Sequence, residues 1–160
     1  MSADSNLDMV RNSPFGSELT GKQCEELAAI INVRNLAGGE FLIREGKVDH
    51  SLYVTVAGEL AVTKSTGAGE EQLHVLAPGS LAGAMGFLDG QEHSASLKAI
   101  SDAKVFSIER SNFETLIEKN PMVVYQVMKT IVRDIHSIVK KMNTSHVEFT
   151  NYISRQHGRY

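Results

Sequence analysis

The chain has 160 residues, of which 42% are hydrophobic and 22% are charged, and its formal net charge is −3. This length fits one domain with its own core, and the hydrophobic fraction excludes a wholly disordered chain. A mildly acidic balance is not typical of a nucleic-acid-binding protein. The single cysteine, Cys24, excludes an intramolecular disulfide and suits a reducing compartment.

Neither a secretory signal nor a membrane-spanning run is recognisable. We therefore expect a cytoplasmic protein with no membrane association. Residues 1–14 are polar and show no periodicity, which predicts a flexible N-terminal tail. Residues 19–33 carry apolar side chains at helical spacing, and Thr20 with Gln23 forms a candidate capping box, so we predict a helix there.

From residue 36 to residue 109 the pattern changes to short alternating runs separated by glycines, such as the tight turn at Ala57-Gly58. We predict strands at 40–44, 52–56, 60–63, 72–76, 94–100 and 104–109, with a loop at 65–71. Six or more short strands at this spacing predict a mainly β fold with flanking helices (α+β), in the form of a cupin-like double-stranded β-roll.

Two helices are predicted after the strands. Ser111 and Glu114 form a candidate capping box for a short helix that ends at Asn120. A long helix over 121–153 follows, with a tail at 154–160, and the β-roll domain is placed at 15–120. Residues 1–120 have a net charge of −7, whereas residues 121–160 have a net charge of +4.

The long helix carries apolar residues at alternating gaps of four and three, which is the pattern of a coiled-coil seam. We predict a homodimer with Met128, Ile131, Ile135, Ile138, Met142 and Phe149 at the interface, on a seam that also includes Val124, Ser145 and Tyr152. A second apolar stripe, at Val127, Val132, Val139 and Val147, indicates that one helix face covers the roll while another meets the partner. The alternative is a single helix that lies flat on its own domain.

Glycines and short motifs in a fixed order complete the pattern: Gly39, Glu45-Gly46, Leu52-Tyr53-Val54 before Gly58, Leu76-Ala77-Pro78-Gly79-Ser80, Gly83, and Asn120-Pro121 before the long helix. Over residues 15–153 this pattern resembles the cyclic-nucleotide-binding domain of the catabolite-activator and protein-kinase-A-regulatory superfamily. The resemblance implies a short helix between two strands, the phosphate-binding cassette. In the family, backbone amides and an arginine of the cassette bind the cyclic phosphate, and a glutamate accepts a hydrogen bond from the ribose.

The cassette predicted from this resemblance comprises Gly83, Ala84, Met85, Gly86, His93, Ser94 and Ala95. Ala84 stands where the family has the glutamate, and it cannot accept a hydrogen bond from a ribose hydroxyl. His93 stands where the family has the arginine, and a histidine with the ordinary pKa of about 6.5 is mostly neutral at pH 7. In the activator-type members of the family, hydroxyl residues midway along the long helix reach the base of the nucleotide. The residues at about that depth here, Ile138 and Val139, are apolar. The residues thus predict a pocket of the family's shape with its ligand chemistry lost.

We interpret the protein as a non-enzymatic regulatory domain for which the residues specify no definite cofactor, and which acts through a homodimer on an unidentified partner protein. One alternative is a genuine cAMP or cGMP sensor that uses His93 and backbone amides. Another is a cupin-type metalloenzyme, for which His50, His74 and His93 are the candidate ligands, although they form no His-x-His pair. In the family, the long helix leads into a helix-turn-helix domain. Only residues 154–160 follow here, so we expect no DNA-binding domain in this chain.

Overall fold

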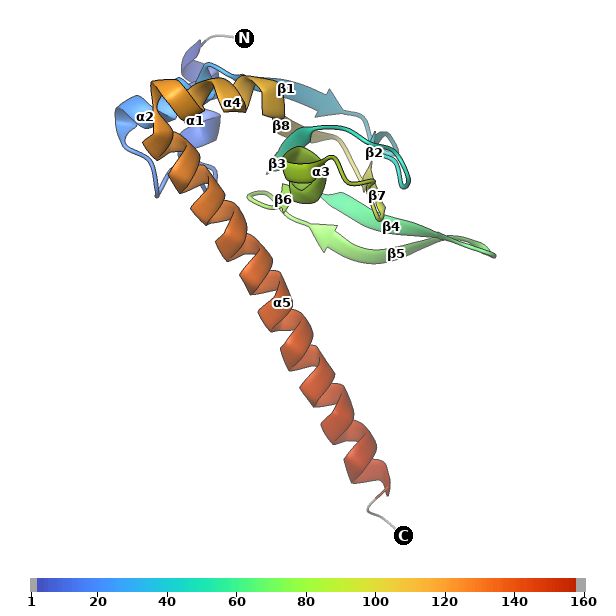
Figure 1. Ribbon diagram of the computed structural model, residues 1–160. Helices are drawn as coiled ribbons and strands as arrows, with labels where there is room; N and C mark the ends of the chain where they lie inside the picture. Colours follow the sequence, from blue (N-terminus) through green and yellow to red (C-terminus); the bar gives the residue numbers. More distant parts are fainter. Residues whose placement is uncertain (1–2, 158–160) are drawn as a thin grey trace.

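The structure of the chain is a computed structural model that describes residues 3–157 (Figure 1). It is a β-roll with α1, α2 and α4 gathered at one end, α3 beside β3, and one long helix, α5, running past the roll. In chain order the elements are α1 (Ala3–Arg11), α2 (Gly21–Ala28), β1 (Ile31–Leu36), β2 (Phe41–Ile43), β3 (Ser51–Ala57), β4 (Leu60–Thr66), β5 (Gly69–Leu76), β6 (Leu81–Ala82), α3 (Ala84–Asp89), β7 (Ser96–Ala99), β8 (Ala103–Glu109), α4 (Arg110–Lys119) and α5 (Pro121–His157).

The strands form two four-stranded sheets, in the orders β1-β8-β3-β6 and β2-β7-β4-β5, and every pairing is antiparallel. Successive side chains of β3 point alternately into two layers of apolar side chains. Leu52 and Val54 lie in the core shared with the helices, whereas Tyr53 packs against the cluster between the sheets. The predicted β-roll with flanking helices is therefore confirmed.

The apolar side chains form two clusters. The smaller cluster lies between the sheets and includes Leu60, Leu97 and Val105. The larger one joins the outer face of the first sheet to the helices; Leu27 and Cys24 of α2 and Val127 of α5 belong to it. Since Cys24 is a buried member of this core, it acts as a small apolar side chain.

The N-terminal predictions need two corrections. Residues 3–11 form helix α1 rather than a flexible tail, because Met9 and Val10 are buried against the rest of the core. The helix predicted over 19–33 is α2, with the predicted Thr20–Gln23 capping box, but it ends at Ala28. Strand β1 takes up residues 31–33 because Ile31 pairs with Ile108 of β8.

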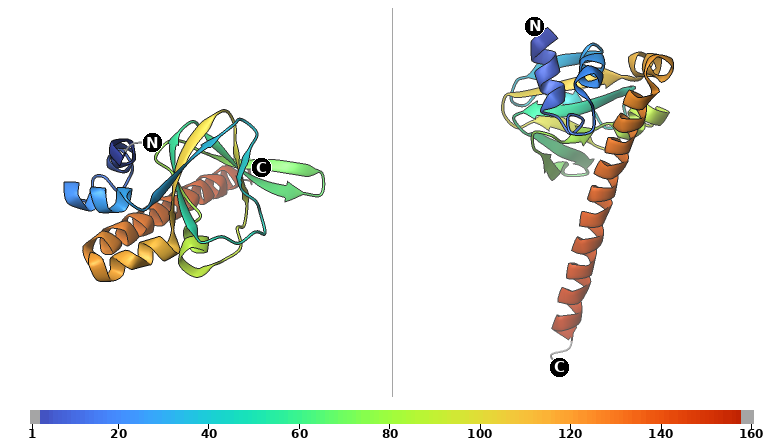
Figure 2. Two further views of the ribbon diagram at one scale, coloured as in Figure 1. Left: turned by 90° about the horizontal axis from the view of Figure 1, so that it is seen from above. Right: turned by 90° about the vertical axis from the view of Figure 1, so that its left-hand side faces the viewer.

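Three further local features of the chain differ from the predictions. The loop predicted at 65–71 is mostly a projecting β4–β5 hairpin (Figure 2), in which Thr66 still pairs with Gly69. No capping box forms at Ser111, because α4 follows β8 directly and its N-cap is Glu109. The tail predicted at 154–160 is helical through His157, and residues 158–160 lie outside the described part of the chain.

Helix α5 changes its surroundings along its length. It begins at Pro121, as predicted, where the lack of an N–H costs a helix nothing. Val123, Val127 and Ile131 are buried in the core of the same chain. Beyond residue 134 the described side chains of the helix are exposed, and the helix extends past the roll (Figure 2).

Gly58 is required by the turn between β3 and β4. Its φ is 75°, and a Cβ there would lie 2.5 Å from the carbonyl oxygen of Asp102. We expect Gly58→Ala to lower the free energy of unfolding by about 2 kcal/mol, from the left-handed backbone and the backbone clash together. Gly67→Ala is the matched control, because nothing lies within 4 Å of a Cβ at that hairpin position. Urea denaturation of both variants checks this, and equal losses would contradict it.

Candidate functional site

The predicted cassette is formed by helix α3 and the segment that leads from it to β7. Gly83 precedes the helix with a φ of 80°, and a Cβ there would lie 2.9 Å from the carbonyl oxygen of Ser51. A side chain at this position would therefore be strained and would also press into β3. The glycine allows the chain to leave β6 and start α3 directly against β3.

Gly86 brings the other side of α3 against the loop between β2 and β3. A Cβ at Gly86 would lie 3.1 Å from the backbone oxygen of Asp49 and 3.2 Å from Cε1 of His93. His93 is held from both sides of its backbone, because its N–H donates to the Lys47 carbonyl and its carbonyl accepts from the Gly46 amide, each at 2.9 Å. The backbone of His93 is thus fixed, and its imidazole lies against Gly86 of the cassette helix.

Asp49 connects this histidine to β3. Its Oδ1 lies 3.1 Å from Nε2 of His93, an ion-pair distance, although the ring N–H is not directed at the carboxylate as in a hydrogen bond. Its Oδ2 accepts a 2.8 Å hydrogen bond from the Tyr53 hydroxyl. Burial, with the hydrogen bond to Asp49 and its negative charge, raises the pKa of Tyr53 to about 12. Tyr53 therefore remains a neutral donor to Asp49 at physiological pH.

The structure brings together only some of the predicted site residues. Gly83, Gly86 and His93 gather around the start of α3, whereas Ser94 is exposed and its carbonyl accepts a hydrogen bond from Lys64 Nζ at 2.8 Å. Met85 is also exposed, and Ala84 presents a methyl group in the first turn. Asp49 and Tyr53 were not predicted, since no short motif marks a loop residue that meets His93 across the fold.

The only charged side chain paired with His93 in the described contacts is the acidic Asp49. His93 itself is almost fully buried, with 7% of its side chain exposed. No basic side chain is found among the predicted cassette residues apart from this histidine. The site therefore lacks a permanent positive charge at the position where the resemblance implies an arginine.

A groove separates the roll from α5. Its volume is about 680 Å³, and its walls come from β5, from the start of β6 and from α5. Ile138 lies in its lining, whereas Val139 is not part of the lining. Leu73, Leu81 and Met142 make the wall largely apolar, with Asp134 and Lys141 at its edge.

Asp134, which lines this groove, allows a test of how a partly buried charge there affects the stability of the domain. Burial raises the pKa of its carboxyl above the ordinary value, and the positive charge of Lys141 offsets part of that rise. A carboxyl with a raised pKa in the folded state lowers stability once the pH is above that pKa. We expect Asp134→Asn to raise the melting temperature near pH 7 by about 1–2 °C and to have no effect near pH 3, where both side chains are neutral. Thermal melts at the two pH values check this; an equal rise at both would point to a cause other than the charge.

Contacts also connect the cassette with the start of α5. The rings of Phe87 in α3 and Phe113 in α4 are 5.2 Å apart and tilted by 58°, and both side chains are buried. Helix α4 ends at Lys119, and the side-chain amide of its C-cap residue, Asn120, donates to Glu26 of α2. The Phe87–Phe113 contact thus joins α3 to α4, and the Asn120 side chain joins the C-terminal end of α4 to α2.

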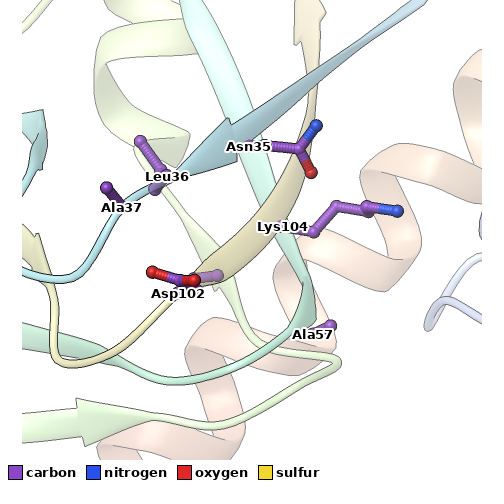
Figure 3. Close-up of a pocket in the computed structure, with 7 residues that line it drawn as sticks. Asn35, Leu36, Ala37, Ala57, Asp102 and Lys104 are labelled. Atoms are coloured by element: carbon purple, nitrogen blue, oxygen red, sulfur yellow. The ribbon is translucent and has the colours of Figure 1, made fainter.

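A separate hollow of about 440 Å³ lies where β1, β8 and the end of β3 meet (Figure 3). Asn35, Asp102 and Lys104 line it, but Asp102 already accepts a hydrogen bond from the Gly38 amide at 3.1 Å. It contains none of the predicted site residues. Among the described residues, no three His, Cys, Asp or Glu side chains lie together as a metal-binding group.

A sequence profile of the cyclic nucleotide-binding domain matches residues 33–120, which is more than half of the chain. The chain belongs to the cyclic nucleotide-binding domain family. This domain is 26% identical over 125 residues to the cyclic AMP receptor protein of Thermus thermophilus, covering 78% of this chain and 58% of that protein. It is 31% identical over 104 residues to a cAMP-dependent protein kinase regulatory subunit of Hypocrea atroviridis, covering 65% of this chain and 22% of that subunit.

Solved structures show the same fold. A cyclic nucleotide-binding domain from Methylobacillus flagellatus superposes with a TM-score of 0.76 at 18% identity, covering 87% of this chain and 79% of that one. The catabolite activator protein of Thermus thermophilus superposes with a TM-score of 0.69 at 24% identity, over 84% of this chain and 63% of that one. Within residues 3–157, no helix has both the length and the apolar character needed to cross a bilayer.

Proposed function

We propose that this cyclic nucleotide-binding domain is a non-enzymatic regulatory domain whose cassette has lost tight cyclic-nucleotide binding. The observation that carries the proposal is the pair Ala84 and His93 at the two cassette positions that should bind ribose and phosphate. Ala84 offers no acceptor, and His93 offers no permanent positive charge. These residues do not fit a cyclic phosphate, because each missing charge-assisted hydrogen bond costs about 1.5–3 kcal/mol.

The second part of the proposal is that the domain acts as a homodimer through α5 and passes its signal to a separate partner protein. Met142 is 65% exposed and Phe149 is 62% exposed, and both lie on the predicted seam. Exposed apolar side chains repeated along a helix that leaves its own domain favour a helical partner. Ile131 does not belong to this interface, because it is 1% exposed and lies in the chain's own core, and Met128 also packs against that core. Ile135, Ile138, Met142 and Phe149 remain.

The alternative is a genuine cAMP or cGMP sensor that uses a protonated His93. The observation that favours it is the 3.1 Å distance between His93 Nε2 and Asp49 Oδ1, at which a protonated imidazole would form an ion pair with the carboxylate. This alternative expects binding that strengthens toward acidic pH and disappears in His93→Ala.

A thermal-shift assay with cAMP and cGMP tests the two possibilities. At about 1 mM ligand, a dissociation constant of about 10 µM would add about 2.7 kcal/mol of stability and raise the melting temperature by about 5 °C or more. The proposal expects a change of no more than about 1 °C at every pH. A large shift near pH 6 that is absent near pH 8 and in His93→Ala would support the alternative.

A further inference from the structure

His93 has a buried ring nitrogen that lacks a hydrogen-bond partner. The side chain of His93 is 7% exposed, and its Nε2 is one of three buried side-chain polar atoms without a hydrogen bond in the described part of the chain. Leaving such a group unpaired costs free energy. The charged atom within reach of Nε2 is Oδ1 of Asp49, at 3.1 Å. Because Nε2 is covered, no external ligand reaches it in this arrangement.

The Asp49 carboxylate is also held by two donors of β3. Its Oδ1 accepts a 3.3 Å hydrogen bond from the Ser51 amide, and its Oδ2 accepts one of 2.8 Å from the Tyr53 hydroxyl. The Ser51 amide, the Tyr53 hydroxyl and His93 Nε2 together are called the Asp49 site below. Backbone amides, tyrosine hydroxyls and imidazoles are the groups that bind oxyanions in proteins. The Asp49 site therefore has the chemistry of an oxyanion site, and the chain's own carboxylate fills it.

The Asp49 site adjoins the cassette helix. A Cβ at Gly86 of α3 would lie 3.2 Å from Cε1 of His93, the residue at the cassette position that should bind phosphate. We propose that Asp49 is a built-in ligand of the cassette: its carboxylate occupies the place of an oxyanion bound by residue 93 and keeps external oxyanions out. This inference rests on the proposed function and deepens it, because it adds an autoinhibitory contact to the losses at Ala84 and His93.

The carboxylate of Asp49 has an advantage over a free anion because it is part of the same chain. It loses no translational freedom on binding, so a dissolved oxyanion at millimolar concentration does not displace it. The site is nevertheless within reach of solvent once the carboxylate is removed, since 33% of the Asp49 side chain is exposed. An arginine at position 93 would have five N–H donors, enough for Asp49 and a phosphate together, whereas Nε2 of the imidazole serves one acceptor.

Chemical rescue by a small oxyanion tests the built-in ligand. Asp49→Ala leaves the donors of the site unpaired, so we expect the melting temperature to fall by about 5 °C. Formate and inorganic phosphate, each at about 100 mM and compared with sodium chloride of the same ionic strength, are the probes. At least one of them should restore half of the loss or more. The native chain and the matched control Asp89→Ala, which removes an exposed carboxylate of α3, should respond by no more than about 1 °C.

Two further variants complete the test. Asp49→Ser keeps an acceptor for the Ser51 amide and vacates the rest of the site, so it should show the rescue even if Asp49→Ala does not fold. Adding His93→Ala to either variant should abolish the rescue, because the anion loses Nε2. Absence of rescue in both Asp49 variants, or rescue that survives His93→Ala, would overturn the inference and leave the proposed function standing. Tight cAMP binding by the native chain in the same assay would instead refute the proposed function, and the inference with it.

Discussion

Ala84→Glu combined with His93→Arg is expected to increase the affinity of the domain for cAMP by at least about a hundredfold. The fold already provides the surroundings for both side chains. Gly83 and Gly86 hold α3 against β3 and the Asp49 loop, so a side chain at position 84 starts from the first turn of the cassette helix. Two charge-assisted hydrogen bonds at about 1.5–3 kcal/mol each correspond to a gain of about two to four powers of ten.

In the variant with Ala84→Glu and His93→Arg, the acidic Asp49 would help to position the new arginine. An arginine at position 93 would emerge where the imidazole now lies 3.1 Å from the Asp49 carboxylate, so the carboxylate would hold the guanidinium beneath α3. The matched control is Met85→Glu with His93→Arg, which adds the same charges but puts the carboxylate on an exposed position of the same helix turn. Fluorescence titration with a labelled cAMP analogue measures both variants. Equal affinities would mean that the carboxylate at position 84 does not decide nucleotide binding.

The second large effect is expected at α5, the helix of the proposed dimer. Met142→Glu should weaken the dimer by about a hundredfold or more, because it places a carboxylate in each half of an apolar seam without a counter-charge. The fold of the domain should survive, since Met142 is 65% exposed in the single chain. Circular dichroism checks the fold, and sedimentation equilibrium measures the dissociation constant.

Val147→Glu is the matched control for Met142→Glu. Val147 is also exposed, at 55%, but it falls at heptad position f, on the face of α5 away from the seam. It should leave the dimer intact. A dimer that tolerates Met142→Glu and loses stability with Val147→Glu would place the interface on the other face of the helix.

The roll could be predicted from sequence because its signals are local. Alternation along Leu52 to Val56 and the glycine at 58 specify a strand and its turn without knowledge of the rest of the chain. Three features depended on tertiary contacts instead. Helix α1 forms because Val10 is buried in the shared core, β1 begins at Ile31 because β8 pairs with it, and α4 needs no capping box because it continues from β8.

The candidate site, too, could be predicted only where its signals are local in the sequence. Glycine spacing predicted the position of the cassette, and the structure places Gly83, Gly86 and His93 together there. Asp49 was missed because its contact with His93 joins segments 44 residues apart. The heptad pattern predicted an interface along the whole of α5, yet periodicity does not say which part of a helix its own domain covers. Ile131 lies in the covered part and Met142 in the exposed part.

Calorimetric titration of the native chain with cAMP, near pH 8 and near pH 6, tests the central claim most directly. The account predicts no saturable heat at ligand concentrations up to about 1 mM at either pH, since the cassette lacks the ribose acceptor and the permanent positive charge. Saturable binding near pH 8 with one cAMP per chain and a dissociation constant below about 10 µM would contradict it.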